Sequence, residues 1–493
     1  MTSTPRRTFL KQVGVTAALP LVPAIFTGCT YPAARMRYNV LSAQGQAMTR
    51  KFARAVEIMK SAPAGDPRSW IFWWYTHAIP VSKAAAIEQV FGGVSSPAED
   101  LAQKAWYTCQ PHQSGENTDN FLPWHRMFIL FFEKLIGAIL RDDSFTLPYW
   151  NYSPGLPSSQ SGIMPESFRS PGDPLLASLY CADRNSGVNS GSPIDAQNPG
   201  LLSTASAMAE TTYSPQGPDQ GFCNNLDFGL HGSVHLLVGT TTNMGYIPTS
   251  AQDPVFWMHH CNIDRLWASW NRAGNPNPTD PDFLSQVFWF AGPDCRAVSI
   301  KVGDVMSIAQ LNYTYQEFEP APFPLRGSTP KPRNHGPWAS VFTTTVASAG
   351  AVSLGSGTTR IQIKPTPDIQ RRLFDLSAAA PSVPDFSAYY LVIRDLRINA
   401  QPEVIYALYL DVSEGASDEA LQALKVGDLN FFQVMPGMEM DELARFVSYD
   451  ITELVKAFGL SASVCGVSLT IIPSGEPAAG SEPVIGSITI QKV

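Results

Sequence analysis

The sequence lacks three features, and each absence excludes a class of protein. It has no long run of lysine or arginine and a net charge of −8, which excludes a nucleic-acid partner because phosphate binding needs concentrated positive charge. Its seven cysteines in 493 residues show no CxxC pair and are too sparse for a disulfide scaffold, although a bridge between Cys181 and Cys223 stays open. Beyond the N-terminal segment no apolar run is long enough to cross a membrane, so we expect no stable membrane insertion.

The N-terminal 35 residues predict an export signal rather than part of the fold. Arg6 and Arg7 precede an apolar run from Val13 to Phe26, and this pattern resembles a twin-arginine signal. The run is too short to span a bilayer comfortably, and Phe26 fits poorly with a lipoprotein cleavage site before Cys29. We therefore expect export through the twin-arginine pathway, to the periplasm or outside the cell, without a lipid anchor.

A chain of 493 residues with 44% apolar composition is expected to form more than one core. The first part carries apolar side chains at helical spacing, with long loops rich in serine, proline and glycine between them. The clearest helical stretches are Gln46–Lys60, Pro123–Arg141, Leu226–Val238 and Asp253–Gly274.

The character of the sequence changes near residue 317, where prolines gather. Short β-branched runs bounded by turn residues follow, such as Thr359–Ile363, Tyr389–Ile393, Val404–Leu410 and Val467–Ile472. We predict a multidomain α + β chain, with a mainly α helical bundle followed by an antiparallel β-sandwich-like domain. The expected boundaries are a signal at 1–35, a helical domain at 36–316, a proline-rich linker at 317–337 and a β-rich domain at 338–493.

Histidine is scarce but concentrated in one part of the chain. Only eight are present, and seven lie between residues 77 and 260. His231 and His235 are four residues apart in a predicted helix, so their rings project from one face. His259 is an adjacent extra, and His335 lies alone in the linker. The other six form two groups of three, namely His77, His112 and His125, and then His231, His235 and His260.

A single histidine on an apolar helix face is more often a core residue than a ligand. Six in two triads, with three of the positions on helices that could face each other across a bundle, are typical of a buried metal site. Neutral imidazole binds zinc, copper, iron or nickel, and the absence of an evident carboxylate ligand favours copper or zinc. Asp264, one turn after His260, is expected to fix an imidazole tautomer from outside the ligand shell.

Two long motifs carry a family resemblance. FLPWHR at residues 121–126 and DPVFWMHHCNIDRLW at residues 253–267 resemble the two copper signatures of tyrosinases, catechol oxidases and hemocyanins. The resemblance covers about residues 37–316 and ends at Tyr313-Thr314-Tyr315, which is similar to the tyrosine motif closing that family's catalytic domain. The β-rich tail is similar, more weakly, to the carboxy-terminal domain that caps the copper site in polyphenol oxidases.

The resemblance implies a type-3 centre of two copper ions in the helical domain, with O2 as co-substrate. The family uses the second member of the His-His pair, so His259 is expected to be a neighbour and not a ligand. Phe256 would pack near the metals, and Ile247 would line the substrate entrance. The first copper would be bound by His77, His112 and His125, and the second by His231, His235 and His260.

Two positions depart from the family pattern. Many members form a thioether between a cysteine and the second ligand, often in a Cys-x-His arrangement, but here the spacing is Cys109-x-x-His112, which leaves the thioether and the free thiol as alternatives. Efficient phenol hydroxylators often carry Asn where this chain has Gly232. Glycine offers no side-chain acceptor for a proton-accepting water, although Asp227 could supply the carboxylate.

The implied activity is oxidation of small phenolic substrates, with o-diphenols converted to o-quinones and hydroxylation of monophenols such as tyrosine less favoured. An o-aminophenol oxidase and a hemocyanin-like oxygen carrier are alternatives on the same metals. A zinc hydrolase is disfavoured, because no Glu follows His231 as the base of such a site. A β-rich tail that caps the pocket would make the full-length protein partly latent, and the sequence leaves homo-oligomer formation open.

Overall fold

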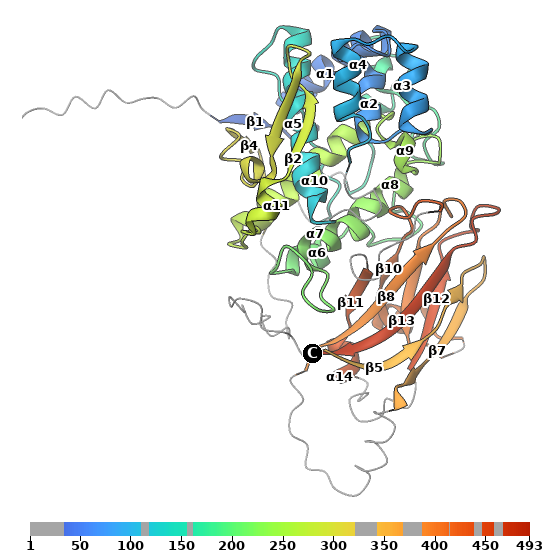
Figure 1. Cartoon of the computed structure of the whole chain (residues 1–493). Coiled ribbons are helices and arrows are strands. Elements are labelled where there is room, and N and C mark those ends of the chain that lie inside the picture. The colour runs from blue at the N-terminus through green and yellow to red at the C-terminus, as the bar shows by residue number, and fades with distance from the viewer. Residues whose placement is uncertain are drawn as a thin grey trace, which may run out of the picture.

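The computed structural model of the chain describes residues 34–109, 118–154, 161–320, 343–367, 387–413, 415–437, 446–457 and 467–493. Figure 1 shows a helical domain, coloured blue to yellow, beside a β-sheet domain, coloured orange to red. Each has its own apolar core, so the mainly α domain followed by an antiparallel β domain is confirmed. The predicted export signal up to residue 33 and most of the predicted linker lie outside the described residues.

Two buried helices form the centre of the helical domain. They are α5 (Phe121–Leu140) and α10 (Val255–Arg272), and nearly every residue in both is buried. Helix α5 is apolar on most sides, as expected for a buried helix, whereas α10 also buries charged side chains such as Asp264 and Arg265. The ring of Phe132 in α5 stacks on Trp257 in α10, with 3.3 Å between the ring centroids. Helical spacing in the sequence predicts both elements, and this contact fixes how they face each other.

Four further helices contribute to the same apolar core, and a serine immediately precedes each one. The hydroxyls of Ser42, Ser69, Ser82 and Ser96 accept hydrogen bonds from backbone N–H groups of the first turns, which satisfies donors that have no partner within the helix. The helices are α1 (Ala43–Ser61), α2 (Trp70–His77), α3 (Lys83–Phe91) and α4 (Pro97–Ala105).

The predicted helix Leu226–Val238 is not continuous. Helix α7 (Gly221–Leu226) leads into a π-helical turn, η5 (Asp227–His231), and then into α8 (Gly232–Val238). Gly229 within the turn has φ −89° and ψ −105°, well outside the helical region. The chain therefore bends where the second predicted histidine group begins.

The remaining elements of the helical domain are short. Strand β1 (Arg35–Arg37) pairs in parallel with β4 (Tyr313–Tyr315), which joins the start of the domain to its end. Among the described residues no helix is both long and apolar enough to cross a membrane. The other elements are η2 (Thr118–Asn120), η3 (Glu166–Phe168), η4 (Ala177–Leu179), α6 (Ala205–Ala209), α9 (Ile247–Ser250), α11 (Pro281–Ser285), the antiparallel pair β2 (Val287–Ala291) and β3 (Ala297–Lys301), and η6 (Val302–Val305).

In the part of the C-terminal domain that the structure describes, the strands form one nine-stranded sheet in the order β10-β9-β12-β7-β5-β13-β8-β11, with β6 also paired to β13. Every pairing in it is antiparallel. The Tyr449 hydroxyl of β11 donates to the Asp428 carbonyl of β10 at 2.9 Å, so the two edge strands meet and the sheet encloses its core. The elements are β5 (Thr344–Ala349), β6 (Val352–Ser353), β7 (Thr359–Pro365), β8 (Tyr389–Arg397), β9 (Tyr406–Leu410), α13 (Asp418–Ala423), β10 (Lys425–Leu429), β11 (Phe446–Asp450), α14 (Thr452–Ala457), β12 (Val467–Pro473) and β13 (Val484–Lys492).

The two domains share buried side chains where β10 is followed by residues 430–435. Phe228 of the π-helical turn belongs to the core of the sheet domain. Phe432 and Ile405 of the sheet domain belong to a cluster with Leu236 and Ile247 of the helical domain. The C-terminal domain therefore lies directly on the segment that carries His231 and His235.

Candidate metal centre

Five of the six predicted ligands converge inside the helical domain. His77 is the last residue of α2, His125 lies in α5, His231 and His235 flank the start of α8, and His260 lies in α10. The centroids of the His125 and His260 rings are 4.2 Å apart, those of His77 and His125 are 5.6 Å apart, and those of His231 and His260 are 5.1 Å apart. The sixth predicted ligand, His112, lies outside the described residues.

Burial keeps four of these imidazoles, those of His77, His125, His235 and His260, in the neutral form that binds metals. Burial, together with the nearby His231, lowers the pKa of His77 to about 3. Burial also lowers the pKa values of His125, His235 and His260 well below the ordinary value, and neighbouring histidines add to the effect. A neutral imidazole has a lone pair on one nitrogen, which is the form required of a metal ligand.

Backbone carbonyls fix which nitrogen of two imidazoles carries the proton. The Nδ1 atom of His125 donates to the Phe121 carbonyl at 2.8 Å, and that of His235 donates to the Met244 carbonyl at 2.8 Å. Each bond leaves Nε2 as the coordinating nitrogen, as in many metal sites.

The donor atoms of this group fit a metal. Among the described residues, Nε2 of His231, Nε2 of His235 and both ring nitrogens of His260 are buried without a hydrogen-bond partner. Such atoms are costly to bury unless a ligand satisfies them. The ligating atoms of His231, His235, His259 and His260 all lie within 4.8 Å of one another, as do those of His77, Cys109 and His125. The two histidine groups therefore fit metal ions.

His259 is closer to the centre than the sequence indicates. Its Nδ1 is hydrogen-bonded to the Tyr152 hydroxyl at 2.9 Å, and its ring stacks on that of His231, with 5.3 Å between centroids. The hydrogen bond to Tyr152 therefore fixes the orientation of the His259 ring. Tyr152 was not singled out from the sequence, because it lies far from both motifs and no periodicity marks it.

Cys109 lies beside the first group. Its Sγ atom is 3.6 Å from Nε2 of His125, and burial raises the pKa of the thiol well above its ordinary value. The predicted thioether to His112 involves a residue outside the described part, so it stays a prediction. The possible bridge between Cys181 and Cys223 is absent, since both are unbridged thiols.

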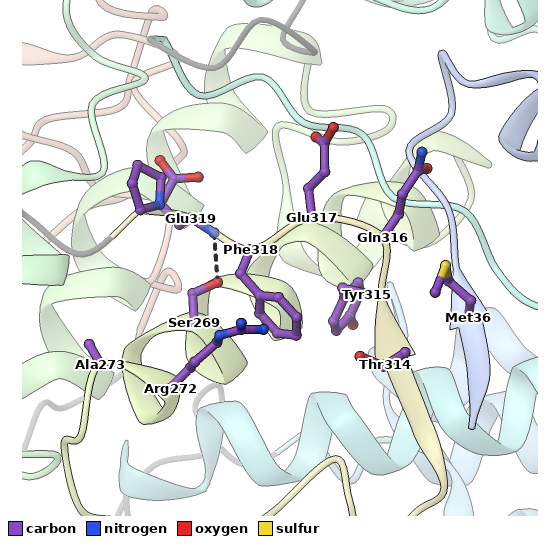
Figure 2. Close-up of a pocket in the computed structure, with 11 residues that line it drawn as sticks. Met36, Ser269, Arg272, Ala273, Thr314, Tyr315, Gln316, Glu317, Phe318 and Glu319 are labelled. Atoms are coloured by element: carbon purple, nitrogen blue, oxygen red, sulfur yellow. Dashed lines mark hydrogen bonds between the residues drawn. The ribbon is translucent and has the colours of Figure 1, made fainter. Parts of the chain in front are cut away.

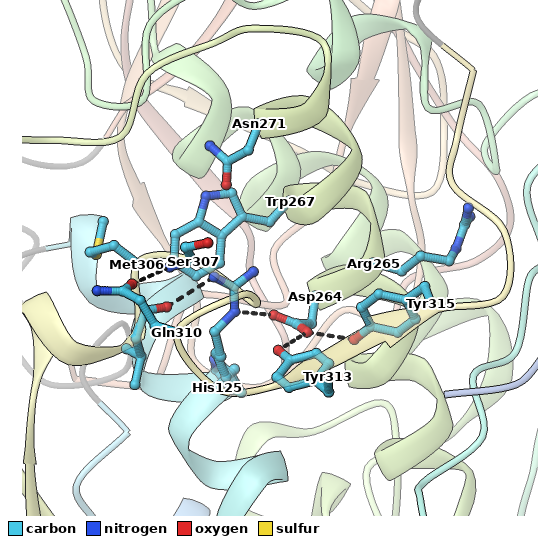
Figure 3. Close-up of polar contacts among 12 residues, drawn as sticks. His125, Asp264, Arg265, Trp267, Asn271, Met306, Ser307, Gln310, Tyr313 and Tyr315 are labelled. Carbon is cyan, nitrogen blue, oxygen red and sulfur yellow. Dashed lines mark hydrogen bonds and ion pairs between the residues drawn. The ribbon is translucent and has the colours of Figure 1, made fainter. Parts of the chain in front are cut away.

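Asp264 has partners other than the imidazole expected from the sequence. Arg126 donates to its Oδ1 at 2.5 Å, while the hydroxyls of Tyr313 and Tyr315 donate to its Oδ2 at 2.6 and 2.5 Å. Figure 3 shows these contacts around the carboxylate. Arg37 of β1 approaches the same oxygen at 3.3 Å, and no histidine is among the contacts described for Asp264. The carboxylate instead ties α10 to α5, β1 and β4, and so holds the ligand-bearing helices together.

Phe256 packs beside the histidine rings, as expected, whereas the expected place of Ile247 at a substrate entrance stays a prediction. The Phe256 ring centroid is 4.2 Å from that of His260 and 4.9 Å from that of His77. Ile247 is fully buried in the cluster that includes Phe432 of the C-terminal domain. The Phe432 ring in turn stacks on His235, with 4.2 Å between centroids and an interplanar angle of 12°.

Asp227 and Gly232 also lie at this interface. Oδ1 of Asp227 is 2.9 Å from Nδ1 of His231. A Cβ atom added at Gly232 would meet Oδ1 of Asn430 at 2.6 Å. The sequence identifies both positions, but it gives no indication that residues of the distant β domain would contact them.

A separate surface pocket of about 630 Å³ lies where the helical domain ends (Figure 2). Its wall includes Arg272 of α10, Phe318 and Glu319, and the Glu319 backbone N–H donates to the Ser269 hydroxyl at 2.9 Å. None of the residues that line it is a predicted ligand. The histidine group is therefore a distinct, enclosed site.

Comparison with known proteins points to one family. The family model described as the common central domain of tyrosinase matches residues 67–180 and 181–273, and that of the polyphenol oxidase middle domain matches residues 277–326. A tyrosinase from Hahella sp. (strain CCB-MM4) is 33% identical over 312 residues, which cover 57% of this chain and 63% of that protein. Aureusidin synthase from Antirrhinum majus is 31% identical over 310 residues, which cover 57% of this chain and 51% of that protein. The chain thus spans about half to two-thirds of the length of these relatives.

Solved structures show the same fold over nearly the whole chain. Latent apple tyrosinase aligns with a TM-score of 0.60 and 22% identity, covering 94% of this chain and 97% of that one. A functional unit of octopus hemocyanin aligns with a TM-score of 0.50 and 16% identity, covering 92% and 99%. With both copper motifs inside the matched segments and their histidines gathered at one buried centre, the chain belongs to the tyrosinase and polyphenol oxidase family.

Proposed function

We propose that this protein is a copper-dependent phenol oxidase that converts o-diphenols to o-quinones with O2. The observation that supports this most strongly is the convergence of five buried imidazole rings, those of His77, His125, His231, His235 and His260. We assign His77, His112 and His125 to one copper and His231, His235 and His260 to the other.

The two copper ions, when bound, would bind O2 and accept the two electrons that a diphenol releases as it becomes an o-quinone. The chain supplies the remaining requirements. Buried Phe256 and Ile247 exclude water from one side, and Phe256 also packs against His260 and His77. Asp227 holds the proton on Nδ1 of His231, and it is the carboxylate we assign to accept a proton from the phenol or from a water beside it.

Diphenol oxidation is favoured over monophenol hydroxylation in this site. Gly232 supplies no side chain to help hold a water near Asp227. The Asp227 carboxylate also accepts a hydrogen bond from Gln433 of the C-terminal domain at 2.6 Å. We therefore expect hydroxylation of substrates such as tyrosine to be slow, although the same centre would permit it.

The test uses copper-loaded full-length protein and a catechol, with quinone followed by its absorbance. Changing His231 to Ala should remove one copper equivalent and the oxidase activity together, whereas Asn399→Ala should change neither, because Asn399 is an exposed residue bonded to Glu482. Retained turnover in the His231 variant would contradict the assignment. The absorption spectrum of the copper-loaded protein after hydrogen peroxide is added checks that both metals act as one centre.

Two other activities remain candidates on the same metals. An o-aminophenol oxidase would release o-quinone imines, and the products formed from o-aminophenols and catechols separate it from the first proposal. An oxygen carrier is favoured by one observation, the fold shared with octopus hemocyanin, and it would bind O2 reversibly without forming quinone. A zinc hydrolase would contain zinc instead of copper, which metal analysis of the purified protein distinguishes.

We also propose that the protein is exported through the twin-arginine pathway. We propose in addition that the isolated full-length protein is partly latent, meaning that its oxidase activity is partly blocked. Arg6 and Arg7 support the first statement, and the Phe432 ring packed on His235 supports the second. Secretion of a fusion carrying residues 1–35, and its loss when both arginines are changed to Lys, tests export.

A further inference from the structure

The π-helical turn that carries His231 receives hydrogen bonds from the C-terminal domain. Nδ2 of Asn430 donates to the Phe228 carbonyl at 2.6 Å and lies 3.4 Å from the Gly229 carbonyl. Nε2 of Gln433 donates to the Asp227 carbonyl at 2.9 Å. A π-helical turn breaks the regular i to i+4 bonding of a helix, so its carbonyls need other donors. Two side-chain amides from residues about 200 positions later in the chain supply them.

The same glutamine bears on the proton of His231. Nε2 of Gln433 also donates to Oδ1 of Asp227 at 2.6 Å. The backbone carbonyl oxygen and the Oδ1 atom of Asp227 therefore accept both hydrogens of the Gln433 amide. Nδ1 of His231 lies 2.9 Å from that carboxylate oxygen and 3.0 Å from Nε2 of Gln433. Since the amide has no third hydrogen, the proton on Nδ1 is directed at Asp227, and Nε2 keeps its lone pair for a metal.

Gly232 permits this contact. The Oδ1 atom of Asn430 occupies the place beside Gly232 where a side chain would begin, since an added Cβ would lie 2.6 Å from it. Asn430 and Gln433 are both buried, and Asn430 Oδ1 accepts from the Phe432 backbone N–H at 3.2 Å. Because Gly232 has no side chain, the two domains can pack closely at this point.

We propose that Asn430 and Gln433 are positioning residues for His231, so that the C-terminal domain helps to hold a ligand of the second copper as well as covering the site. This inference rests on the proposed copper function. The segment at residues 430–435 then has two separate effects on the site. Phe432 controls access by lying on the His235 ring, whereas the two amides fix the backbone and the imidazole tautomer at His231.

The first test follows copper release from full-length protein. Gln433→Met keeps the length of the side chain but removes its donors, and Asn399→Ala is the control on the surface of the same domain. Copper-loaded proteins are challenged with a strong copper chelator, and the metal that remains bound is measured over time. We expect Gln433→Met to lose one of its two copper equivalents about tenfold faster than the wild type, the loss expected for a buried hydrogen-bonded partner, while the control behaves as wild type.

A second measurement tests the turn without metal. Hydrogen exchange of the amides at residues 227–235 should be faster in metal-free Gln433→Met and in Gly232→Ala than in wild type, and unchanged in Asn399→Ala. Asn430→Ala serves as a second variant if Gln433→Met does not fold. If Gln433→Met binds two copper ions, releases them at the wild-type rate and shows unchanged hydrogen exchange at residues 227–235, this inference alone is overturned. A wild-type chain that binds no copper would overturn the inference and the proposed function together.

Discussion

The aromatic ring of Phe432 lies against His235, on the side where we propose that a planar substrate binds. The side chain is fully buried, and its ring lies nearly parallel to the imidazole. Changing Phe432 to Ala removes the stacking and much of the apolar contact, which together contribute roughly 2–4 kcal/mol. We therefore expect catechol oxidation by the full-length protein to increase at least about tenfold, measured as kcat/KM with unchanged copper content.

A conservative change tests the cause of that increase. Phe432→Tyr keeps an aromatic ring against His235 and should leave the full-length protein close to wild-type activity. If Phe432→Ala is no more active than wild type while its copper content is complete, the ring does not limit access.

The residues that sequence reasoning identified and those it missed differ in one physical respect. His125 and His260 stand inside long motifs, and His231 and His235 are spaced by one helical turn, so local sequence marks them. Phe432 and Gln433 meet the site only through contacts across about 200 residues of chain. No local pattern encodes such a contact, and only the folded structure reveals it.

At the scale of elements, helical periodicity predicts the long helices well because burial determines it. The expected stretch from Pro123 to Arg141 corresponds to α5, and the expected strand Tyr389–Ile393 lies within β8. The sequence does not predict helices α2, α3 and α4, because each has only eight or nine residues and so gives a short periodic pattern. The π-helical turn was also missed, since four-residue spacing of His231 and His235 fits a regular helix equally well.

The start of α10 depends on a buried ion pair. Arg184 contacts both oxygens of Asp253, at 2.7 and 2.8 Å, and both side chains are fully buried. Oδ1 of Asp253 also accepts from the Val255 backbone N–H at 3.1 Å. The chain therefore fixes the first turn of the helix that carries His260 by charge as well as by packing.

Changing Asp253 to Ala would leave the Arg184 guanidinium buried without its carboxylate. We expect the free energy of unfolding to fall by about 3–5 kcal/mol, measured by urea unfolding of the full-length protein. The matched control is Asp294→Asn, which alters an exposed pair with Arg296 at 3.8 Å and should change stability by less than about 1 kcal/mol. Equal stability of the two variants would show that the pair does not hold the helix start.

The whole molecule places a group of neutral histidines in a dry interior, and this makes its stability depend on pH. Burial lowers the pKa values of His125, His235, His259 and His260 well below the ordinary value and that of His77 to about 3. In the unfolded chain each imidazole takes up a proton near its ordinary value of 6.5. Between about pH 6.5 and pH 3 the unfolded state therefore binds more protons than the folded state.

Stability of the metal-free protein should accordingly fall as pH decreases through this window, by up to about 1.4 kcal/mol per pH unit for each buried histidine. Urea unfolding at pH 7.5 and pH 5.5 measures the difference. Bound copper would compete with the protons for the same nitrogens, so the loaded protein should show a smaller change above the pH at which the metal is released. An identical free energy of unfolding at both pH values, without metal, would contradict the assignment of neutral buried imidazoles.

Removing the C-terminal domain combines the two effects that its loop has on the site. A chain ending near residue 320 lacks Phe432, so substrates reach His235 and freshly loaded protein should oxidise catechols faster than the full-length form. It also lacks Asn430 and Gln433, so the turn at His231 loses three short hydrogen bonds and the second copper should be released sooner. Catechol oxidation by the truncated chain should therefore begin high and decline with incubation in a chelator, while Phe432→Ala in the full chain begins high and stays high.

Because truncation exposes Phe228 and Leu236, which are buried against the sheet domain, the comparison is made on soluble, folded material. A soluble truncation whose turnover equals that of the full-length protein would refute latency, and one whose high activity does not decline would show that the helical domain holds His231 without help.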